Sequence, residues 1–441
     1  MAATEPLAVA GGAPVISEHE HRRWPEILPE DREAVLRVLD RGILCGANSP
    51  EIVGLEDDWS RYLGVDYCIA LNSGTAALHC ACAAVGLLPG DEVIVPAFTF
   101  VATAMAVAHQ GATPVFCDVD LGSYNIDPAK LEERITERTR AIMPVHLHGL
   151  PADMDEIAAI ADRHGLAVIE DAAQAHGAVY RGRKVGTLGD CAGFSLNATK
   201  NLSGGEGGLF VTQDAAAFEA ARRLSVFGED VPPTGPGEFR GYVTHGVGWN
   251  YRNQELSAAF ARSQLARLDR YNETARANAA VLTRGLSRVP GVVPPLVPDD
   301  RESVYHKYRV RLDAAALGFD GSAPELRDRV VRALRAEGVD AAIWQVLPLP
   351  AYPAFRRPLA PSQPGADGPP LRPWDPAEYP VSSRLLDESL VLGSETHPLF
   401  VQEPALMERY AEAVEKVLAS LEDLLALPYE PVVLRPPVEL A

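Results

Sequence analysis

Short runs of apolar residues alternate with longer helical stretches from about residue 65 to residue 212. Each run is apolar almost throughout and is bounded by small or polar residues, which is typical of a strand buried on both faces. We predict seven such strands, at 67–71, 92–95, 114–119, 141–145, 167–170, 192–196 and 208–212. The stretches between them include three predicted helices, which run from 75 to 86, from 100 to 110 and from 154 to 164. This alternation predicts an α/β domain with a mainly parallel sheet.

The pattern changes near residue 255, where one long amphipathic helix is predicted over 255–285. Shorter strands and helices follow it in α+β order, at 304–312, 324–337, 339–344 and 404–424. We therefore predict two domains, namely an N-terminal arm with a large domain at 1–270 and a smaller C-terminal domain at 271–441. The proline-rich stretches 231–237 and 357–380 are predicted to be surface loops, and the first is a candidate for a mobile flap.

Composition limits the possible partners. The chain has 441 residues, with 40 basic and 60 acidic side chains and a net charge of −20. Such a protein repels phosphate backbones and anionic membrane surfaces, so we expect neither nucleic acid nor a membrane as a partner. No apolar stretch reaches the length of a membrane span, and the N-terminus lacks the basic region and apolar core of a signal peptide. We therefore expect a cytoplasmic protein.

The six cysteines form no CxxC pair, and most of them lie in apolar runs. This arrangement is more typical of buried free thiols in a reducing compartment than of disulfides or metal ligands. We therefore predict no metal site.

Lysine is rare in this chain, which makes each lysine a candidate for chemistry. The 40 basic residues include lysine at 130, 184, 200, 307 and 416 and arginine elsewhere. Lysine can lose its proton and act as a nucleophile, whereas arginine cannot. Lys200 follows an apolar strand and lies in a loop of small residues, where a bulky ligand can approach the backbone closely. It can form an imine with an aldehyde there, although an exposed loop lysine is an equal alternative on this segment alone.

Two further segments place suitable groups at the carboxyl ends of predicted strands, where ligands bind in such sheets. Asp171 ends one strand and is followed by small residues, so it can pair with a protonated ring nitrogen while Ala173 lies under the ring. A helix N-cap is the alternative role for Asp171. The turn formed by Ser73, Gly74 and Thr75 opens a helix, whose N–H groups can hold a phosphate. Together with Lys200, these groups indicate a pyridoxal phosphate (PLP) site.

Longer segments carry a family resemblance. They are NSGTAAL, GDEVIVPAFTFVAT, PVHLHGLPADMDEI, EDAAQAHGAVYRGRKVGTLGD, FSLNATKNLSGGEGG and WNYRNQELSAAFARSQL. In order and spacing they resemble the DegT/DnrJ/StrS-type PLP-dependent aminotransferases, over roughly residues 10–345. The resemblance implies an aspartate aminotransferase-like fold (PLP fold type I), a homodimer with shared active sites, and amino transfer from L-glutamate or L-glutamine. The acceptors it implies are keto-sugars or keto-cyclitols in antibiotic or cell-envelope pathways.

The resemblance also implies roles for individual residues. By position, Lys200 looks like the lysine that carries the cofactor as a Schiff base and shuttles the proton, and Asp171 looks like the pyridinium partner. The other cofactor contacts that it implies are Gln174 to the ring hydroxyl, Phe100 on the ring face opposite Ala173, Gly74, Thr75 and Ser195 to the phosphate, and Asn250 to the phosphate of the other subunit. The residues alone indicate Lys200, Asp171 and the turn at 73–75, but not Phe100 or Asn250.

The C-terminal part departs from the family pattern. The short motif usual near the end of the small domain is not recognisable, and LPLPAYPAFRR and VLGSETHPLF stand there instead. His148, His306 and His397 are candidates to line the substrate site, although such histidines more often have a structural role.

Three other functions remain open at this point. A PMP-dependent dehydratase of this family typically has histidine in place of the lysine, so Lys200 argues against that function. A synthase that couples PLP chemistry to aromatisation is not excluded. A regulatory protein that binds PLP without turnover is the third, and it agrees less well with the complete set of Lys200, Asp171 and Ser195.

Overall fold

The computed structural model describes residues 6–17, 20–46, 48–230, 241, 243–356 and 375–432. The loop predicted at 231–237 and most of the proline-rich loop predicted at 357–380 lie outside these residues. Within the described part, no helix is both long enough and apolar enough to cross a membrane. All six cysteines are free thiols, and five of them are buried while Cys45 is exposed.

The predicted mainly parallel sheet is present and has seven strands in the order β1-β9-β8-β5-β4-β2-β3. Four neighbouring pairs are parallel, and β9 runs antiparallel to both of its neighbours. The strands are β1 (Tyr67–Leu71), β2 (Glu92–Pro96), β3 (Thr113–Cys117), β4 (Thr139–Ile142), β5 (Ala167–Asp171), β8 (Cys191–Ser195) and β9 (Gly208–Thr212). The predicted strands are thus confirmed, with ends displaced by one residue at β2, β5 and β8 and by one to three residues at β3 and β4.

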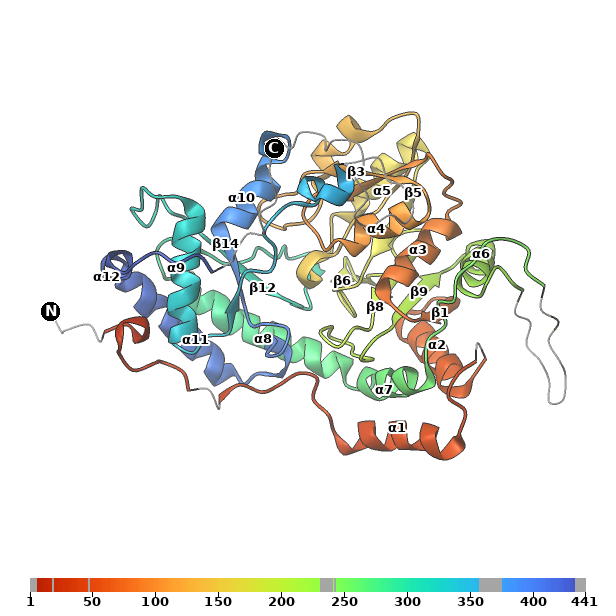
Figure 1. The fold of residues 1–441 in the computed structure, drawn as a ribbon, viewed down its shortest axis with the longest axis horizontal. Helices are drawn as coiled ribbons and strands as arrows, with labels where there is room; N and C mark the ends of the chain where they lie inside the picture. The colour runs from red at the N-terminus through yellow and green to blue at the C-terminus, as the bar shows by residue number, and fades with distance from the viewer. Residues whose placement is uncertain are drawn as a thin grey trace.

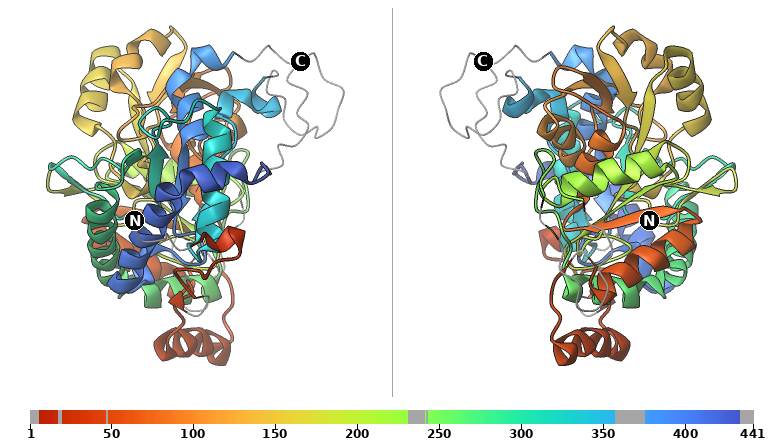
Figure 2. Two further views of the ribbon diagram at one scale, coloured as in Figure 1. Left: turned by 90° about the vertical axis from the view of Figure 1, so that its left-hand side faces the viewer. Right: turned by 90° about the vertical axis from the view of Figure 1, so that its right-hand side faces the viewer.

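Helices cover both faces of this sheet, which explains why its strands are apolar throughout. One core contains α3 (Gly74–Ala84) and α4 (Ala102–His109), and the other contains α2 (Pro50–Leu63) and α7 (Glu255–Leu265). The alanine-rich α3 has eight of its eleven residues buried. The remaining helices of this domain are α5 (Met154–His164), α6 (Ala215–Ser225) and α1 (Pro29–Arg41), and α1 lies beyond α7 at the edge of the molecule (Figures 1 and 2).

The prediction of a single helix over 255–285 was wrong, because the chain forms two helices there. The first is α7, and the second is α8 (Leu268–Leu286), which runs into the smaller domain (Figure 1). Arg267 lies between them with non-helical backbone angles, and its side chain pairs with buried Asp31 of α1 at 2.7 Å. The break carries no glycine or proline, so the amphipathic pattern continues through it.

The smaller domain is α+β, as predicted. Its sheet has the order β10-β12-β14-β13, with β10 (Val292–Val293), β12 (Tyr308–Leu312), β13 (Ala341–Ala342) and β14 (Ser389–Leu392). Its other helices are α9 (Ala323–Ala336), α10 (Pro380–Glu388), α11 (Pro404–Ala419) and α12 (Leu421–Ala426). The strands predicted at 304–312 and 339–344 are shorter than expected, and the last predicted helix breaks at Ser420. Leu7 and Ile16 of the N-terminal arm join the core of this domain.

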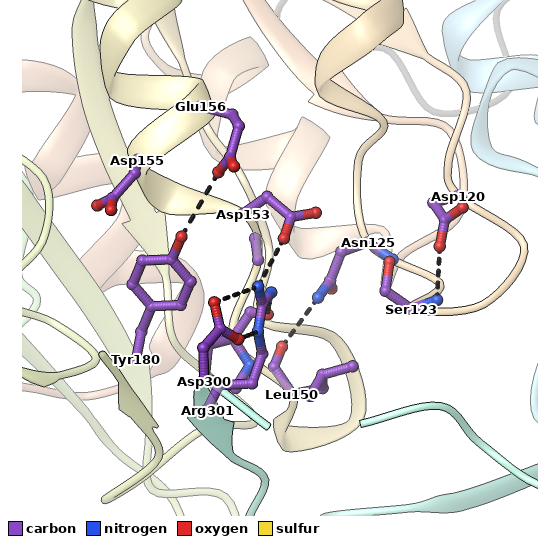
Figure 3. A network of polar contacts seen from close by, with 12 residues as sticks. Asp120, Ser123, Asn125, Leu150, Asp153, Asp155, Glu156, Tyr180, Asp300 and Arg301 are labelled. Atoms are coloured by element: carbon purple, nitrogen blue, oxygen red, sulfur yellow. Dashed lines mark hydrogen bonds and ion pairs between the residues drawn. The ribbon is translucent and has the colours of Figure 1, made fainter. Parts of the chain in front are cut away.

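A small third sheet connects the two parts of the chain. In it, β11 (Arg301–Glu302) pairs with β6 (Val179–Tyr180), which also pairs with β7 (Arg183–Lys184). Arg301 binds Asp153 of the large domain at 2.7 Å and also its neighbour Asp300 (Figure 3). The chain after α8 is thereby fixed against the loop that follows β4.

Candidate active site

The candidate residues meet at one edge of the large sheet. The loops at this edge follow β1 (73–75), β2 (98–100), β4 (146–148) and β5 (172–174), and Ser195 ends β8. All five strands run in the same direction, so their carboxyl ends lie on the same side of the sheet. This is the side on which α/β sheets bind ligands.

The turn before α3 is closed tightly against β8. Ser73 caps the helix by accepting a hydrogen bond from the Ala76 amide at 3.1 Å. A Cβ atom at Gly74 would lie 2.7 Å from Cβ of Ser195, so only glycine fits there. The first N–H groups of a helix have no intrahelical acceptor, which leaves those of Gly74 and Thr75 available beside the Ser195 hydroxyl. This cradle fits a phosphate group.

Asp171 is a buried carboxylate at the end of β5. It accepts hydrogen bonds from the Thr103 hydroxyl at 2.7 Å and from the Ala173 amide at 3.1 Å. Burial raises the pKa of Asp171, and the bond from Thr103 opposes that shift. A buried carboxylate of this kind is stabilised by a cationic partner, so its chemistry fits a protonated ring nitrogen.

Gln174 and Phe100 flank the same space. Gln174 Oε1 accepts a hydrogen bond from the His148 amide at 2.8 Å, which leaves the Gln174 amide nitrogen as a donor. Phe100 follows β2 and is 55% exposed, although Thr99 before it is fully buried. Its open ring can stack on a flat ligand.

Lys200 lies in the loop after β8, and this loop folds back on itself. The Lys200 amide bonds to Asn197 O at 2.9 Å, and the Ala198 amide bonds to Gly205 O at 2.8 Å. Burial and the charge of Lys307 lower the pKa of Lys200 to about 8, while Asp171 and Glu395 act in the opposite direction. Roughly a tenth of its amine is therefore neutral and nucleophilic at pH 7, far more than for an ordinary lysine.

Asn250 lies close to this edge through its backbone. Asn250 O accepts a hydrogen bond from Asn72 Nδ2 at 3.3 Å, next to the turn before α3. Its surroundings are exposed apolar side chains, namely Phe227, Val247 and Trp249, of which Val247 is 84% exposed. The position of Asn250 on the surface is compatible with a contact to a second subunit.

The three histidine candidates differ in their surroundings. His148 and His306 are buried, and burial lowers the pKa of each well below its usual value. His397 is partly exposed and pairs with Asp340 at 2.9 Å, which agrees with a structural role. The His148 loop is held by the bond from Asn125 Nδ2 to Leu150 O at 3.0 Å (Figure 3).

The structure adds residues that the sequence did not indicate. Thr103 contacts Asp171, and the small domain contributes Lys307, Arg309 and Trp344 around His148. The rarity of lysine was a signal for Lys307 as well as for Lys200. Nothing in the sequence marks the other three, because their contacts join segments far apart in the chain.

Comparison with known proteins identifies similar sequences. Residues 25–366 match the model of the DegT/DnrJ/EryC1/StrS aminotransferase family. A "Pleiotropic regulatory protein" of Geobacillus stearothermophilus is 41% identical over 341 residues, which are 76% of this chain and 84% of the relative. A "dTDP-3-amino-3,4,6-trideoxy-alpha-D-glucose transaminase" of Streptomyces venezuelae is 39% identical over 334 residues, which are 75% of this chain and 82% of the relative.

A solved structure shows the same arrangement of the chain. It is S. venezuelae DesV in complex with a ketimine intermediate, with 35% identity and a TM-score of 0.74. The match covers 88% of this chain and 94% of that chain. The expected aspartate aminotransferase-like fold (PLP fold type I) is thereby confirmed.

Proposed function

Since this chain belongs to the DegT/DnrJ/EryC1/StrS aminotransferase family, whose members depend on PLP, we propose that it aminates a keto-sugar or keto-cyclitol in a biosynthetic pathway. L-Glutamate or L-glutamine is the proposed amino donor. The observation that carries the proposal is the meeting of three groups at one sheet edge. They are the lysine with lowered pKa, the buried carboxylate of Asp171, and the helix start that closes on Ser195.

Each of these groups has a defined task in holding PLP. The turn at Ser73, Gly74 and Thr75 would bind the phosphate together with the Ser195 hydroxyl. Asp171 would keep the ring nitrogen protonated, and Gln174 would donate from its amide nitrogen to the ring hydroxyl. Phe100 would stack on the ring face opposite Ala173. When bound, the cofactor supplies an electron sink for the carbon that loses its proton.

Lys200 would have two tasks in amino transfer. It would anchor the cofactor covalently, and its free amine would then move the proton that leaves Cα of the donor. Its lowered pKa suits this work, because a base with a pKa of about 8 is partly neutral at neutral pH and can still accept a proton. The acceptor class is supported by the name of the S. venezuelae transaminase, which acts on a sugar.

The first half of the reaction tests this proposal. We expect the purified protein with PLP to lose its visible absorbance band and gain a near-ultraviolet band when excess L-glutamate or L-glutamine is added, because the cofactor becomes its amine form. D-Glutamate serves as the matched control. If PLP binds but neither donor changes the spectrum, amino transfer is wrong, and a regulatory function like that in the name of the Geobacillus relative gains support.

A homodimer with shared active sites is part of the proposal. It is supported by the family resemblance and by the exposed apolar side chains around Asn250. Asn250 would bind the phosphate held by the other subunit, so a complete site needs two chains.

Mixing two inactive variants tests the shared site. We expect Lys200→Ala to be inactive, and Asn250→Ala to be inactive at a PLP concentration that loads the wild type, because it binds PLP more weakly. The two variants are mixed in equal amounts, unfolded together and refolded. Half of the resulting dimers would then contain one chain of each variant, and each of these mixed dimers would have one intact site. Activity should therefore recover to roughly a quarter of the wild-type value. No recovery would mean that Asn250 acts within its own chain.

A further inference from the structure

Lys307 is a second lysine near Lys200, placed by a tight contact between the two domains. The Val304 amide donates to Gly149 O at 3.0 Å, and the Lys307 amide lies 3.5 Å from His148 O. Gly149 has a φ of +90°, and a Cβ there would lie 2.7 Å from Cγ2 of Val304. The segment that carries Lys307 is thereby fixed against the loop after β4, at the carboxyl edge of the large sheet.

The side chain of Lys307 is enclosed and forms an ion pair. It is 4% exposed, and its ammonium group lies 5.3 Å from the centre of the Trp344 ring. It pairs with Glu395 at 3.3 Å. Burial lowers the pKa of Lys307, while Glu395 opposes the shift. A buried ammonium group needs an anion beside it, because an unpaired buried charge is costly.

The two partners of this ion pair differ strongly in exposure. The side chain of Glu395 is 51% exposed, compared with 4% for Lys307. An exposed carboxylate gains little from such a pair, because water solvates it well and its side chain is free to move. Another carboxylate can therefore replace Glu395 at Lys307 at low cost.

The neighbouring groups also favour an anion. Arg309 donates from Nε to His148 Nε2 at 2.9 Å and from Nη1 to Ser389 Oγ at 2.7 Å. Within the described part of the chain, Arg309 Nη2 and His148 Nδ1 are buried and have no hydrogen-bond partner. Because His148 accepts at Nε2, its proton is on Nδ1, so both unpartnered atoms are donors. Lys307, Arg309 and His148 all line the same small cavity.

We propose that Lys307 binds the α-carboxylate of the amino donor, which displaces Glu395, and that Glu395 returns to Lys307 when the acceptor occupies the site. This inference rests on the proposed amino transfer. The α-carboxylate is bonded to Cα, the atom from which Lys200 would take its proton, so it must lie near Lys200. The Lys307 amide contacts His148 O, and the His148 amide donates to Gln174 Oε1 at 2.8 Å, so Lys307 lies beside the proposed cofactor site. This exchange explains how one site accepts two different substrates. The donor supplies a carboxylate to Lys307, whereas the keto acceptor has no carboxylate at that position and Glu395 takes its place.

Substitutions of the two partners of this ion pair should change the affinity for the amino donor in opposite directions. We expect Lys307→Met to raise the dissociation constant of the donor by about 10- to 100-fold, because a charged hydrogen bond is lost. Glu395→Gln removes the competing carboxylate and should lower the same constant a few-fold. The measurement is the donor dependence of the single-turnover absorbance change with L-glutamate and L-glutamine. Lys184→Met is the matched control, since Lys184 also lies over an aromatic ring, at 3.5 Å from the centre of Tyr62, but outside the site.

The outcomes separate this role from a structural one. If the ion pair only stabilises the fold, both substitutions weaken donor binding alike, and that result overturns the proposal. Lys307→Arg should retain donor affinity within a few-fold, which excludes misfolding as the cause of the Met effect. If Lys307→Met impairs the acceptor half-reaction and leaves the donor half-reaction unchanged, Lys307 binds the acceptor and the proposal is wrong.

A binding measurement without turnover distinguishes this inference from the proposed function. Glutarate carries the carboxylates of the donor but no amino group, so its calorimetric affinity reports on the anion site alone. We expect the glutarate affinities to follow the order expected for the donor, so that Glu395→Gln binds glutarate more tightly than the wild type and Lys307→Met binds it more weakly. This order without any donor reaction would refute amino transfer but keep the anion site. Donor reaction with unchanged glutarate affinity in Lys307→Met would refute the anion site.

Discussion

Replacing Lys200 by alanine is expected to lower the rate of amino transfer by at least about 10³-fold, because both the covalent anchor and the proton carrier are removed. Burial of the amine and the charge of Lys307 hold the pKa of Lys200 at about 8, which keeps it reactive. Alanine leaves the loop intact, since the bonds that shape it come from backbone groups such as that between Ala198 and Gly205. The measurement is the rate of the donor-induced absorbance change, with Lys184→Ala as the control.

Covalent trapping identifies the anchoring lysine independently of activity. Borohydride reduction of the PLP-loaded protein, followed by mass spectrometry, should place the cofactor on the peptide that contains Lys200. After reduction, the Lys200→Ala variant should release PLP on denaturation, while the Lys184→Ala control should retain it. The alternative in this fold is Lys307, which is buried and lies near the same edge. Cofactor found on the Lys307 peptide would reverse the tasks proposed for the two lysines.

The large sheet could be predicted because its strands are apolar over their whole length. The strands 67–71 and 208–212 have the predicted bounds, and α5 begins and ends at the predicted residues. The antiparallel direction of β9 could not be predicted, since an apolar run carries no information about direction. The break between α7 and α8 could not be predicted either, because it depends on the contact of Arg267 with Asp31, which lies 236 residues away in the sequence.

The candidate site was predictable where its residues end strands. Asp171 and the turn at 73–75 follow apolar runs directly, so topology alone brings them to one edge. The contact between Arg309 and His148 joins residues 161 positions apart, and it depends on how the domains pack. Asn250 was indicated by resemblance alone, and its proposed task depends on a second chain.

Asp171→Asn is the second substitution with a large expected effect, about 10²- to 10⁴-fold on the rate constant of the donor half-reaction. The amide has nearly the shape of the carboxylate but no charge to keep the ring nitrogen protonated. The fold should survive, because burial already raises the pKa of Asp171 and a neutral group is less costly there. One of the two hydrogen bonds from Thr103 and Ala173 is lost, which costs about 1 kcal/mol.

Thr103→Val separates charge from geometry at this carboxylate. It removes the bond of 2.7 Å to Asp171 and leaves the charge in place, so we expect the rate to fall by about tenfold or less. Thermal unfolding of both variants should change little, which makes the rate difference a measure of the charge. If Asp171→Asn keeps the wild-type rate while PLP is bound, the carboxylate is a structural cap for the turn at Ala173, and the ring nitrogen needs another partner. The structure therefore makes the ratio of these two effects, rather than either loss alone, the decisive quantity for the role of Asp171.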